Sequence, residues 1–341
     1  MTEKRVNVAV LGAGKAGLLF GKAVNASKNG RLVALVAETA EEAESVGAAL
    51  EHVDRTSGNW REVIESDDIE AVFIATPTFL HAEMTIAAAE AGKHVLCDKP
   101  LCLSVAESDA MIAACENAGV LLMVGFLERF NPAFRVLKER IRSGKIGRPV
   151  MVWSRRSHPP RHGSWIMDDA KSGGAFLHTG CHNIDLVQWL FDSPMVRITA
   201  EQIESGISPG FTDVASVIGT LECGVLVTQV ESYAHPPTQP MGVDRSFEIL
   251  GTGGTLYLDL LRSPVTLCNE DGWKYEDVLT WVEADGQLSG ALTAETEYFL
   301  DCVLSGSAPD QASGADGRRT IAVFEAARRA VAEGRRVDVS S

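Results

Sequence analysis

A short apolar run leads directly into a glycine-rich turn near the start of the chain. The run is Val6 to Leu11, and the turn has the pattern Gly-x-Gly-x-x-Gly over residues 12–17. Apolar residues recur at helical spacing after the turn, so the order is strand, turn, helix. Such glycines permit a tight bend, a close approach of backbone to a pyrophosphate, and close packing of helix on strand. The pattern therefore predicts a dinucleotide-binding unit whose turn residues are Gly12, Gly14, Lys15, Ala16 and Gly17.

An acidic residue follows the second apolar run, which spans residues 31–37. This residue, Glu38, lies about twenty positions beyond the turn, where a carboxylate accepts hydrogen bonds from the adenosine ribose. Thr39 and Ala40 come next, so no basic side chain is close enough to favour a 2′-phosphate. The pattern favours NAD over NADP. The alternative is that Glu38 is an ordinary helix-start acid, since Thr39 and Glu42 form a capping box.

Strands and helices alternate up to about residue 125. Strand-like runs cover 72–76, 94–97 and 120–124, and helical patterns cover 81–91 and 104–118. This alternation predicts a parallel sheet. The carboxyl ends of parallel strands share one edge, which should bring together Gly12, Glu38, Thr76, Pro77 and Lys99.

The pattern changes in the second part of the chain, which we assign as an α+β domain over residues 126–341. Strand-like runs separated by short turns predict an antiparallel sheet. These runs are 150–154, 196–202, 216–221, 225–231, 245–251 and 255–259. Helices are expected at about 178–191, 291–304 and 317–333. We therefore expect a Rossmann domain over residues 1–125, followed by this second domain.

The composition excludes several classes of protein. The 341 residues carry a net charge of -15, which disfavours binding to nucleic acid or anionic membranes. No apolar run approaches the ~20 residues of a membrane span, and the apolar start is a strand, not a signal peptide. The seven cysteines form no C-x-x-C pair, which predicts free thiols and a cytoplasmic protein. His178, Cys181 and His182 have metal-ligand spacing, but without an evident fourth ligand we expect no metal.

Three polar residues in the 173–190 segment could perform chemistry. His178, His182 and Asp185 are spaced i, i+4 and i+7, so one helix would present them on one face. A histidine could take the proton of a substrate hydroxyl, and Lys99 could stabilise a developing alkoxide. The alternative is that the histidines are core residues and Lys99 is a surface charge. Spacing alone does not decide between the two.

Four segments together resemble the glucose-fructose oxidoreductase / inositol dehydrogenase / MocA (Gfo/Idh/MocA) family. They are VAVLGAGKAG, ATPTFLHAEMTIAAAEAGKHVLCDKPL, GFLERFNP and SGGAFLHTGCHNIDLVQWL. The resemblance implies a Rossmann domain, an open-faced antiparallel sheet domain and a substrate between them. It makes Lys99 the catalytic lysine, with a cis bond to Pro100, and His182 the acid/base. Asp185 would contact substrate or steady the site, and His81 and Asp98 join the expected cofactor-binding residues.

The chain departs from the resemblance at His178, where many members have aspartate. An aspartate would raise the pKa of the following histidine, whereas a second imidazole would not. We expect His178 to bind a different sugar hydroxyl or to share in proton transfer. The other candidate substrate contacts are Arg129, Arg155, His158 and Trp165, which suit a charged sugar or, alternatively, only solvent and packing.

Three functions remain open from the sequence. The first is an NAD-dependent dehydrogenase acting on a secondary hydroxyl of a cyclic polyol or sugar. The second is a glycoside-cleaving enzyme that needs NAD without net reduction, and the third is a non-catalytic sensor of NAD or sugar. In each case we expect a homodimer or homotetramer, because an open sheet face would leave apolar surface exposed on a monomer.

Overall fold

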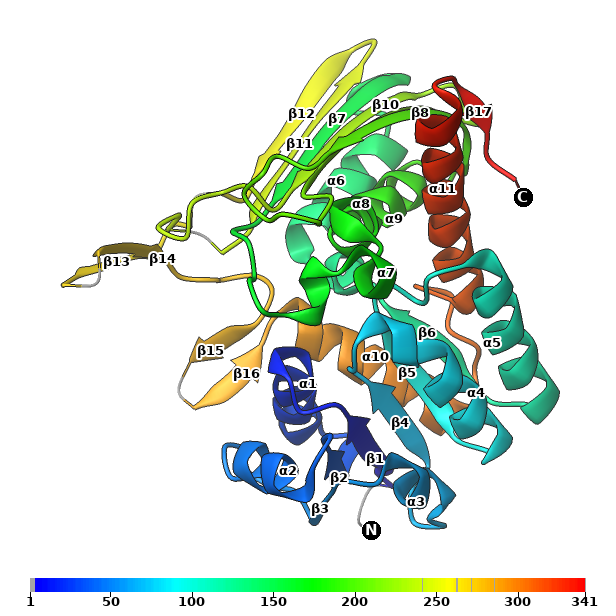
Figure 1. The fold of residues 1–341 in the computed structure, drawn as a ribbon, viewed down its shortest axis with the longest axis vertical. Coiled ribbons are helices and arrows are strands. Elements are labelled where there is room, and N and C mark those ends of the chain that lie inside the picture. The colour runs from blue at the N-terminus through cyan, green and yellow to red at the C-terminus, as the bar shows by residue number, and fades with distance from the viewer. Residues whose placement is uncertain (1–3, 241, 262, 271, 285, 341) are drawn as a thin grey trace. The chain divides into compact units, whose positions relative to one another are not determined.

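The computed structural model describes residues 4–240, 242–261, 263–270, 272–284 and 286–340 (Figure 1). The chain divides into two compact units. The first comprises Met1–Cys102, Ala106–Phe130 and Leu279–Arg318, and the second comprises Leu103–Val105, Asn131–Val278 and Arg319–Ser341. The chain passes from the first unit to the second between Phe130 and Asn131. It returns to the first unit at 279–318, a return that the sequence pattern did not indicate.

The first unit is built on a parallel sheet of six strands in the order β3-β2-β1-β4-β5-β6. This is the Rossmann order, with the switch point between β1 and β4. The central strands are almost wholly buried runs of apolar residues, as expected where helices cover both faces. The strands are β1 (Val6–Leu11), β2 (Gly30–Val36), β3 (Arg55–Ser57), β4 (Ala71–Ile74), β5 (His94–Asp98) and β6 (Leu122–Gly125).

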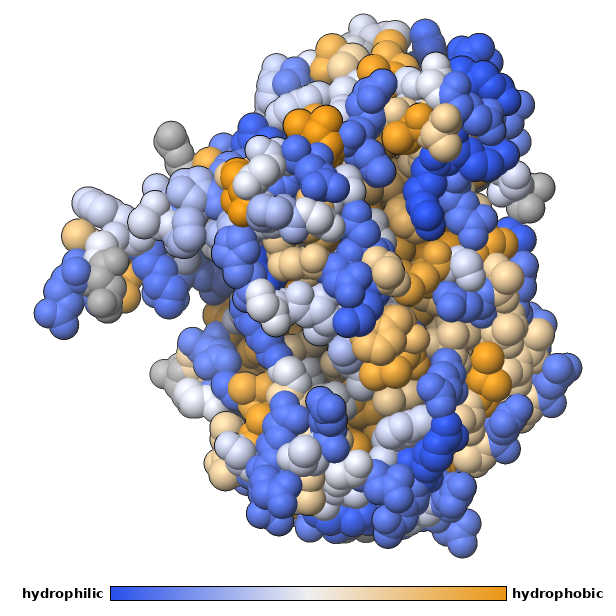
Figure 2. Space-filling model, in the orientation of Figure 1, coloured by the Kyte–Doolittle hydropathy of each residue, from blue (hydrophilic) through white to orange (hydrophobic). Residues whose placement is uncertain are grey.

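Helices of the first unit alternate with these strands along the sequence. They are α1 (Lys15–Ala26), α2 (Ala40–Gly47), α3 (Trp60–Glu65), α4 (His81–Glu90) and α5 (Val105–Ala118), with 3-10 turns η1 (Thr78–Leu80) and η2 (Leu127–Phe130). The expected capping box is present, since the Thr39 hydroxyl accepts the Glu42 N–H at 3.2 Å. The surface over α2 and α3 is mostly hydrophilic (Figure 2).

The returning segment contributes α10 (Ala291–Ser305) and a small hairpin of β15 (Val282–Ala284) and β16 (Gln287–Ser289). The ring of Phe299 packs edge-on against Phe73 of β4, with centroids 5.6 Å apart. The Glu297 carboxylate accepts hydrogen bonds from Ser27 and Asn29 just after α1. These contacts make α10 part of the core of the first unit.

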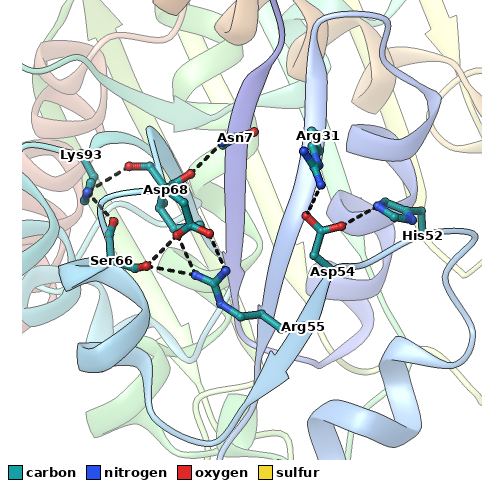
Figure 3. Close-up of polar contacts among 9 residues, drawn as sticks. Asn7, Arg31, His52, Asp54, Arg55, Ser66, Asp68 and Lys93 are labelled. Atoms are coloured by element: carbon teal, nitrogen blue, oxygen red, sulfur yellow. Dashed lines mark hydrogen bonds and ion pairs between the residues drawn. The ribbon is translucent and has the colours of Figure 1, made fainter.

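Charged side chains tie together the amino ends of the parallel strands (Figure 3). Arg55 makes a two-pronged ion pair with Asp68, at 2.6 and 2.8 Å. The buried Lys93 donates to the carbonyls of Ser66 and Ile69, both at 2.9 Å. Hydrogen bonding to Arg55 holds the pKa of Asp68 well below its usual range. This edge is therefore fixed by structural ion pairs, and the opposite edge is left for function.

The second unit contains a seven-stranded sheet in the order β12-β11-β7-β10-β9-β8-β17. The expected antiparallel sheet is present, since neighbouring strands are antiparallel except β7 and β10, which are parallel. The reason is that helices separate β7 from the β8–β10 hairpins, and this crossover returns the chain parallel to β7. The strands are β7 (Pro149–Ser157), β8 (Met195–Ile203), β9 (Val214–Leu221), β10 (Leu226–Ser232), β11 (Asp244–Gly251), β12 (Gly254–Asp259) and β17 (Val337–Asp338).

Helices pack against one face of this sheet, where α8 and α9 contact β7, β9 and β10. The helical elements are α6 (Pro132–Arg142), η3 (Trp165–Met167), α7 (Asp169–Ser172), α8 (Gly174–His178), α9 (Gly180–Leu190) and α11 (Gly314–Glu333), which begins in the first unit. The other face exposes Ile218, Leu226 and Tyr257. A separate hairpin pairs β13 (Thr266–Asn269) with β14 (Gly272–Tyr275). Among the described residues, no helix has the length and apolar character needed to cross a bilayer.

Candidate active site

The glycine turn has a geometry that only glycine satisfies at two of its three positions. Gly12 has φ +110°, and a Cβ there would lie 2.5 Å from the carbonyl oxygen of Ala75. A Cβ on Gly17 would lie 1.8 Å from the carbonyl oxygen of Gly12. A Cβ on Gly14 would meet nothing within 4 Å. The first and third glycines therefore serve packing, whereas Gly14 borders open space in which a ligand could approach the backbone.

The amino end of α1 is suited to an anion. The helix begins at Lys15 with Gly14 as its N-cap, and no side chain caps it. Its first turn contains no acidic residue, so the partial positive charge of the helix end is not neutralised locally. These features fit a dinucleotide diphosphate above the turn.

Glu38 lies just beyond the end of β2 and is exposed. The Gly12 N–H donates to the Val36 carbonyl at 2.8 Å, which fixes the end of β2 beside the turn. Because Thr39 already caps α2, Glu38 is not needed for that purpose. The position fits hydrogen bonding to ribose hydroxyls.

The strand register brings the other expected cofactor residues to the same edge. Leu11 is paired with Ile74, and Ile74 with Cys97, so β1, β4 and β5 end level with one another. Thr76 and Pro77 follow β4, and Lys99 follows β5. The structure thus places Gly12, Glu38, Thr76, Pro77 and Lys99 along one carboxyl edge, as their spacing predicts.

His81 connects two loops of this edge and is itself buried. Its Nδ1 lies 2.9 Å from the carbonyl oxygen of Pro100, and its Nε2 lies 2.9 Å from that of Thr76. Burial lowers the pKa of His81, against the opposing effect of Asp98 and the two carbonyls. A neutral imidazole donates to only one of the carbonyls. His81 thus holds together the loops that follow β4 and β5.

The Asp98-Lys99-Pro100 segment has a cis peptide between Lys99 and Pro100, as the family resemblance implied. Burial raises the pKa of Asp98, opposed by the charges of Lys99 and His81. A Cβ on Gly125 would lie 3.1 Å from the Asp98 Cα, so β6 packs closely on this segment. The backbone around Lys99 is therefore held by His81 at Pro100 and by β6 at Asp98.

Arg129 is placed as a structural residue. Its side chain is only 5% exposed and forms an ion pair with Asp316 at 3.2 Å. Its guanidinium also lies over the ring of Phe126. This pairing at the end of η2 favours a structural role over the expected contact with substrate.

The histidine segment of the second unit is interrupted, in contrast to the single helix expected over 178–191. Helix α8 ends at His178, and α9 begins at Gly180. His182 and Asp185 share α9 at a spacing of three, so they lie on one face of it, but His178 belongs to the preceding helix. All three side chains are buried.

An aromatic group surrounds His178. Its Nδ1 is hydrogen-bonded to the hydroxyl of Tyr233, and the ring of Trp165 meets it edge-on at 5.5 Å. His158 stacks on Tyr233 with centroids 5.2 Å apart. The structure thus brings together three of the expected substrate residues, His158, Trp165 and His178, around Tyr233. Sequence reasoning missed Tyr233, because nothing near it in the sequence indicates this contact.

Arg155 is not part of this group. It lies on the sheet face opposite the helices, in a two-pronged ion pair with Asp244 at 2.7 and 3.1 Å. Alternation along β7 places its neighbour Arg156 on the helix-covered face, where it is buried. Arg156 rather than Arg155 therefore shares a face with the histidine helices.

Glu231 is a buried acid that the sequence analysis also missed. It lies opposite Arg156 in the β7–β10 ladder and is fully buried. A Cβ on Gly180 would lie 3.0 Å from its side chain, so the carboxyl group packs against the first residue of α9. Burial raises the pKa of Glu231 well above its usual value, although Gln229 and Arg156 oppose the shift.

The described residues contain no cluster of three or more His, Cys, Asp or Glu side chains that could hold a metal ion. All seven cysteines are free thiols, and five of them are buried. Burial raises the pKa of Cys97 well above its usual value, which makes this thiol unreactive.

Comparison with known proteins covers nearly the whole chain. Residues 6–126 match the model of an oxidoreductase family with an NAD-binding Rossmann fold, and residues 138–339 match the C-terminal alpha/beta domain of that family. A scyllo-inositol 2-dehydrogenase (NAD(+)) of Bacillus subtilis is 30% identical over 90% of this chain and 89% of its own length. An inositol 2-dehydrogenase of Rhizobium meliloti is 31% identical over 98% and 99%.

Solved structures show the same fold. Myo-inositol 2-dehydrogenase from Lactobacillus plantarum superposes with a TM-score of 0.83 at 25% identity, covering 99% of this chain and 100% of that one. GenD2 from gentamicin A biosynthesis, solved in complex with NAD, gives a TM-score of 0.89 at 23% identity, covering 100% and 98%. The second match shows the fold alone.

Proposed function

Because the chain belongs to the Gfo/Idh/MocA oxidoreductase family, we propose that it oxidises a secondary hydroxyl of a cyclic polyol or sugar with NAD. Relatives at 30% and 31% identity are named as inositol 2-dehydrogenases, which supports an inositol-like substrate. The observation that carries the proposal is the position of Lys99. Lys99 directly follows the end of β5, which is at the same edge of the sheet as the glycine turn and Glu38.

The residues that would hold NAD follow from the geometry of that edge. The diphosphate would meet the amino end of α1 at Gly14, and the ribose hydroxyls would meet Glu38. When bound, NAD supplies the acceptor for the hydride that leaves the substrate carbon. His81 would act indirectly by holding the Thr76 and Pro100 loops.

We assign the proton chemistry to His182 and Lys99. As hydride leaves a carbinol carbon, the hydroxyl proton must pass to a base, and His182 would accept it. The Lys99 ammonium would stabilise negative charge on the oxygen. Asp185 shares the His182 face of α9 and would steady the site or contact substrate.

His178 would contribute to substrate choice. Tyr233 and Trp165 hold its ring, so it can present a fixed hydrogen-bonding edge. We propose that His178 contacts a substrate hydroxyl other than the one oxidised. The neighbouring rings of His158 and Trp165 would line the same part of the substrate site. Imidazole in place of a carboxylate would favour a substrate group that either donates or accepts a hydrogen bond.

The proposal is tested by a panel of inositols, aldoses, uronates and their phosphates, assayed with NAD and NADP in parallel. We expect substrate-dependent NADH formation, with NAD preferred. His182→Ala should lower kcat by ~10²-fold or more. A rate unchanged in His182→Ala would remove this residue from the mechanism.

We also propose that the uncovered sheet face carries self-association into a homodimer or homotetramer. Cross-strand pairing aligns Ile218, Thr228, Trp153, Glu248 and Tyr257 in one row across that face. Ile218 of β9 is 48% exposed and Tyr257 of β12 is 73% exposed, which is unusual for large hydrophobic side chains on one sheet face. A second copy would cover them.

A further inference from the structure

A tryptophan from the returning segment contacts the glycine turn. The ammonium of Lys15 lies 5.3 Å from the centre of the Trp281 ring, within the range of a cation–π interaction. Lys15 is the first residue of α1 and follows Gly14 directly. Trp281 is half-buried, and Lys15 is exposed. The two residues are 266 positions apart in the sequence, so their contact depends on the fold.

The segment that carries Trp281 is fixed on both sides. The carbonyls of Leu279 and Thr280 accept the N–H groups of Ala291 and Leu292 at 2.9 and 3.0 Å, which ties the segment to the start of α10. Gly290 has φ +98°, and a Cβ there would lie 2.8 Å from the Leu279 carbonyl oxygen. Any other residue at 290 would push this attachment apart.

The β15–β16 hairpin that follows Trp281 lies against α1 (Figure 1). The carboxylate of Glu283 pairs with the Lys22 ammonium at 2.8 Å, two turns along α1 from Lys15. Leu288 of β16 is buried. Residues 279–284 and 286–290 therefore form a strap, attached to α10 at both its ends and to α1 through Glu283.

We propose that Trp281 is a positioning residue for NAD, holding the Lys15 ammonium beside the diphosphate site at the amino end of α1. A lysine side chain has several rotatable bonds and loses conformational entropy when it binds an anion. An aromatic ring under the ammonium restricts that motion beforehand, so less entropy is lost on binding. The inference rests on NAD occupying the glycine turn, as proposed above.

If Trp281 acts through the diphosphate site, replacing it should weaken ligands that carry phosphate and should leave ligands without phosphate unaffected. NAD, ADP and adenosine would be titrated calorimetrically into the full-length protein, without any turnover. Trp281→Leu should weaken ADP and NAD about three- to tenfold and leave adenosine unchanged. Trp281→Phe keeps an aromatic face and should lose less. Lys15→Gln should have at least the effect of Trp281→Leu and should reduce the salt dependence of ADP binding.

The double variant decides whether Trp281 acts through Lys15. Adding Trp281→Leu to Lys15→Gln should cause no further loss, because the ring then has no ammonium to hold. Trp273→Leu is the matched control, since Trp273 is 67% exposed and lies outside the strap, and it should leave ADP binding unchanged.

Four results would overturn the proposal. Equal weakening of adenosine and ADP in Trp281→Leu would indicate a general packing role. A further loss of affinity in the double variant would indicate that the ring contacts NAD independently. If wild-type protein binds NAD and the Trp281→Leu variant binds ADP as tightly as wild type, the role of Trp281 is excluded and the proposed function is not affected. Wild-type protein that binds neither NAD nor ADP would overturn the proposed function as well.

Discussion

Nδ1 of His178 and the hydroxyl of Tyr233 share a hydrogen bond in the core of the second unit. Burial raises the pKa of Tyr233, so its hydroxyl stays protonated and can donate to Nδ1. This pair fixes the orientation of the His178 imidazole ring.

Tyr233→Phe removes this hydrogen bond and leaves the ring in place. We expect kcat/KM for the polyol to fall about fivefold, because a neutral hydrogen bond is worth about 1 kcal/mol, while affinity for NAD is unchanged. Steady-state kinetics would measure the loss. Tyr257→Phe, on the exposed sheet face, is the matched control. A fall in NAD affinity equal to that in kcat/KM would contradict a role confined to the substrate.

His178→Asp restores the aspartate that the family resemblance leads one to expect. A carboxylate at the end of α8 would stabilise an imidazolium at His182 in α9, if the two side chains face the same substrate. The base form of His182 would then need a higher pH, so the acidic limb of the kcat/KM profile should move to higher pH. The preferred substrate should change as well. An unaltered profile and an unaltered substrate preference would place residue 178 outside the site.

Glu231→Gln should increase stability at high pH. Because burial raises the folded pKa of Glu231, the unfolded chain releases this proton first, and stability falls as pH rises from about 4.3 towards the folded pKa. Each unit of the shift costs about 1.4 kcal/mol. Glutamine has no such cost, so the Tm of Glu231→Gln should exceed that of wild type at pH 8 by about 1–2 °C per kcal/mol removed.

Thermal melts of both proteins between pH 4 and pH 8 would test this. Below the unfolded pKa both side chains are neutral, and the difference should disappear. If Glu231→Gln were less stable than wild type at pH 8, the carboxylate would be ionised and stabilised by Arg156.

Ile218→Asp should disrupt self-association. A charge in the middle of a buried apolar interface is left without water or a partner. We expect the Ile218→Asp variant to sediment as a monomer. Its melting temperature should fall little, since residue 218 is 48% exposed in the single chain. Glu204→Gln, at another exposed position of the second unit, is the control. An unchanged sedimentation coefficient would exclude this face as the interface.

The sequence predicted those features that depend on local order along the chain. The strand–turn–helix start, the parallel sheet and the shared edge of Gly12, Glu38 and Lys99 follow from periodicity and from the rule that parallel strands end together. The cis bond at Lys99–Pro100 came from the family resemblance alone.

Features that depend on distant pairings were not visible in the sequence. Nothing near Trp281 indicates that it contacts Lys15, and nothing near Tyr233 indicates that it holds His178. The side of the sheet on which Arg155 lies depends on strand register, which alternation alone does not fix. The break at Thr179 was missed because two short helices in succession have the same apolar spacing as one.

Substrate-dependent formation of NADH is the most direct test of the account. Purified protein with NAD would be assayed against the polyol and sugar panel, with His182→Ala and Lys99→Met alongside. The account predicts NADH absorbance that rises with at least one inositol-like substrate and falls by ~10²-fold in His182→Ala. Tight NAD binding without turnover on any member of the panel, or cleavage of a glycoside without NADH accumulation, would contradict it.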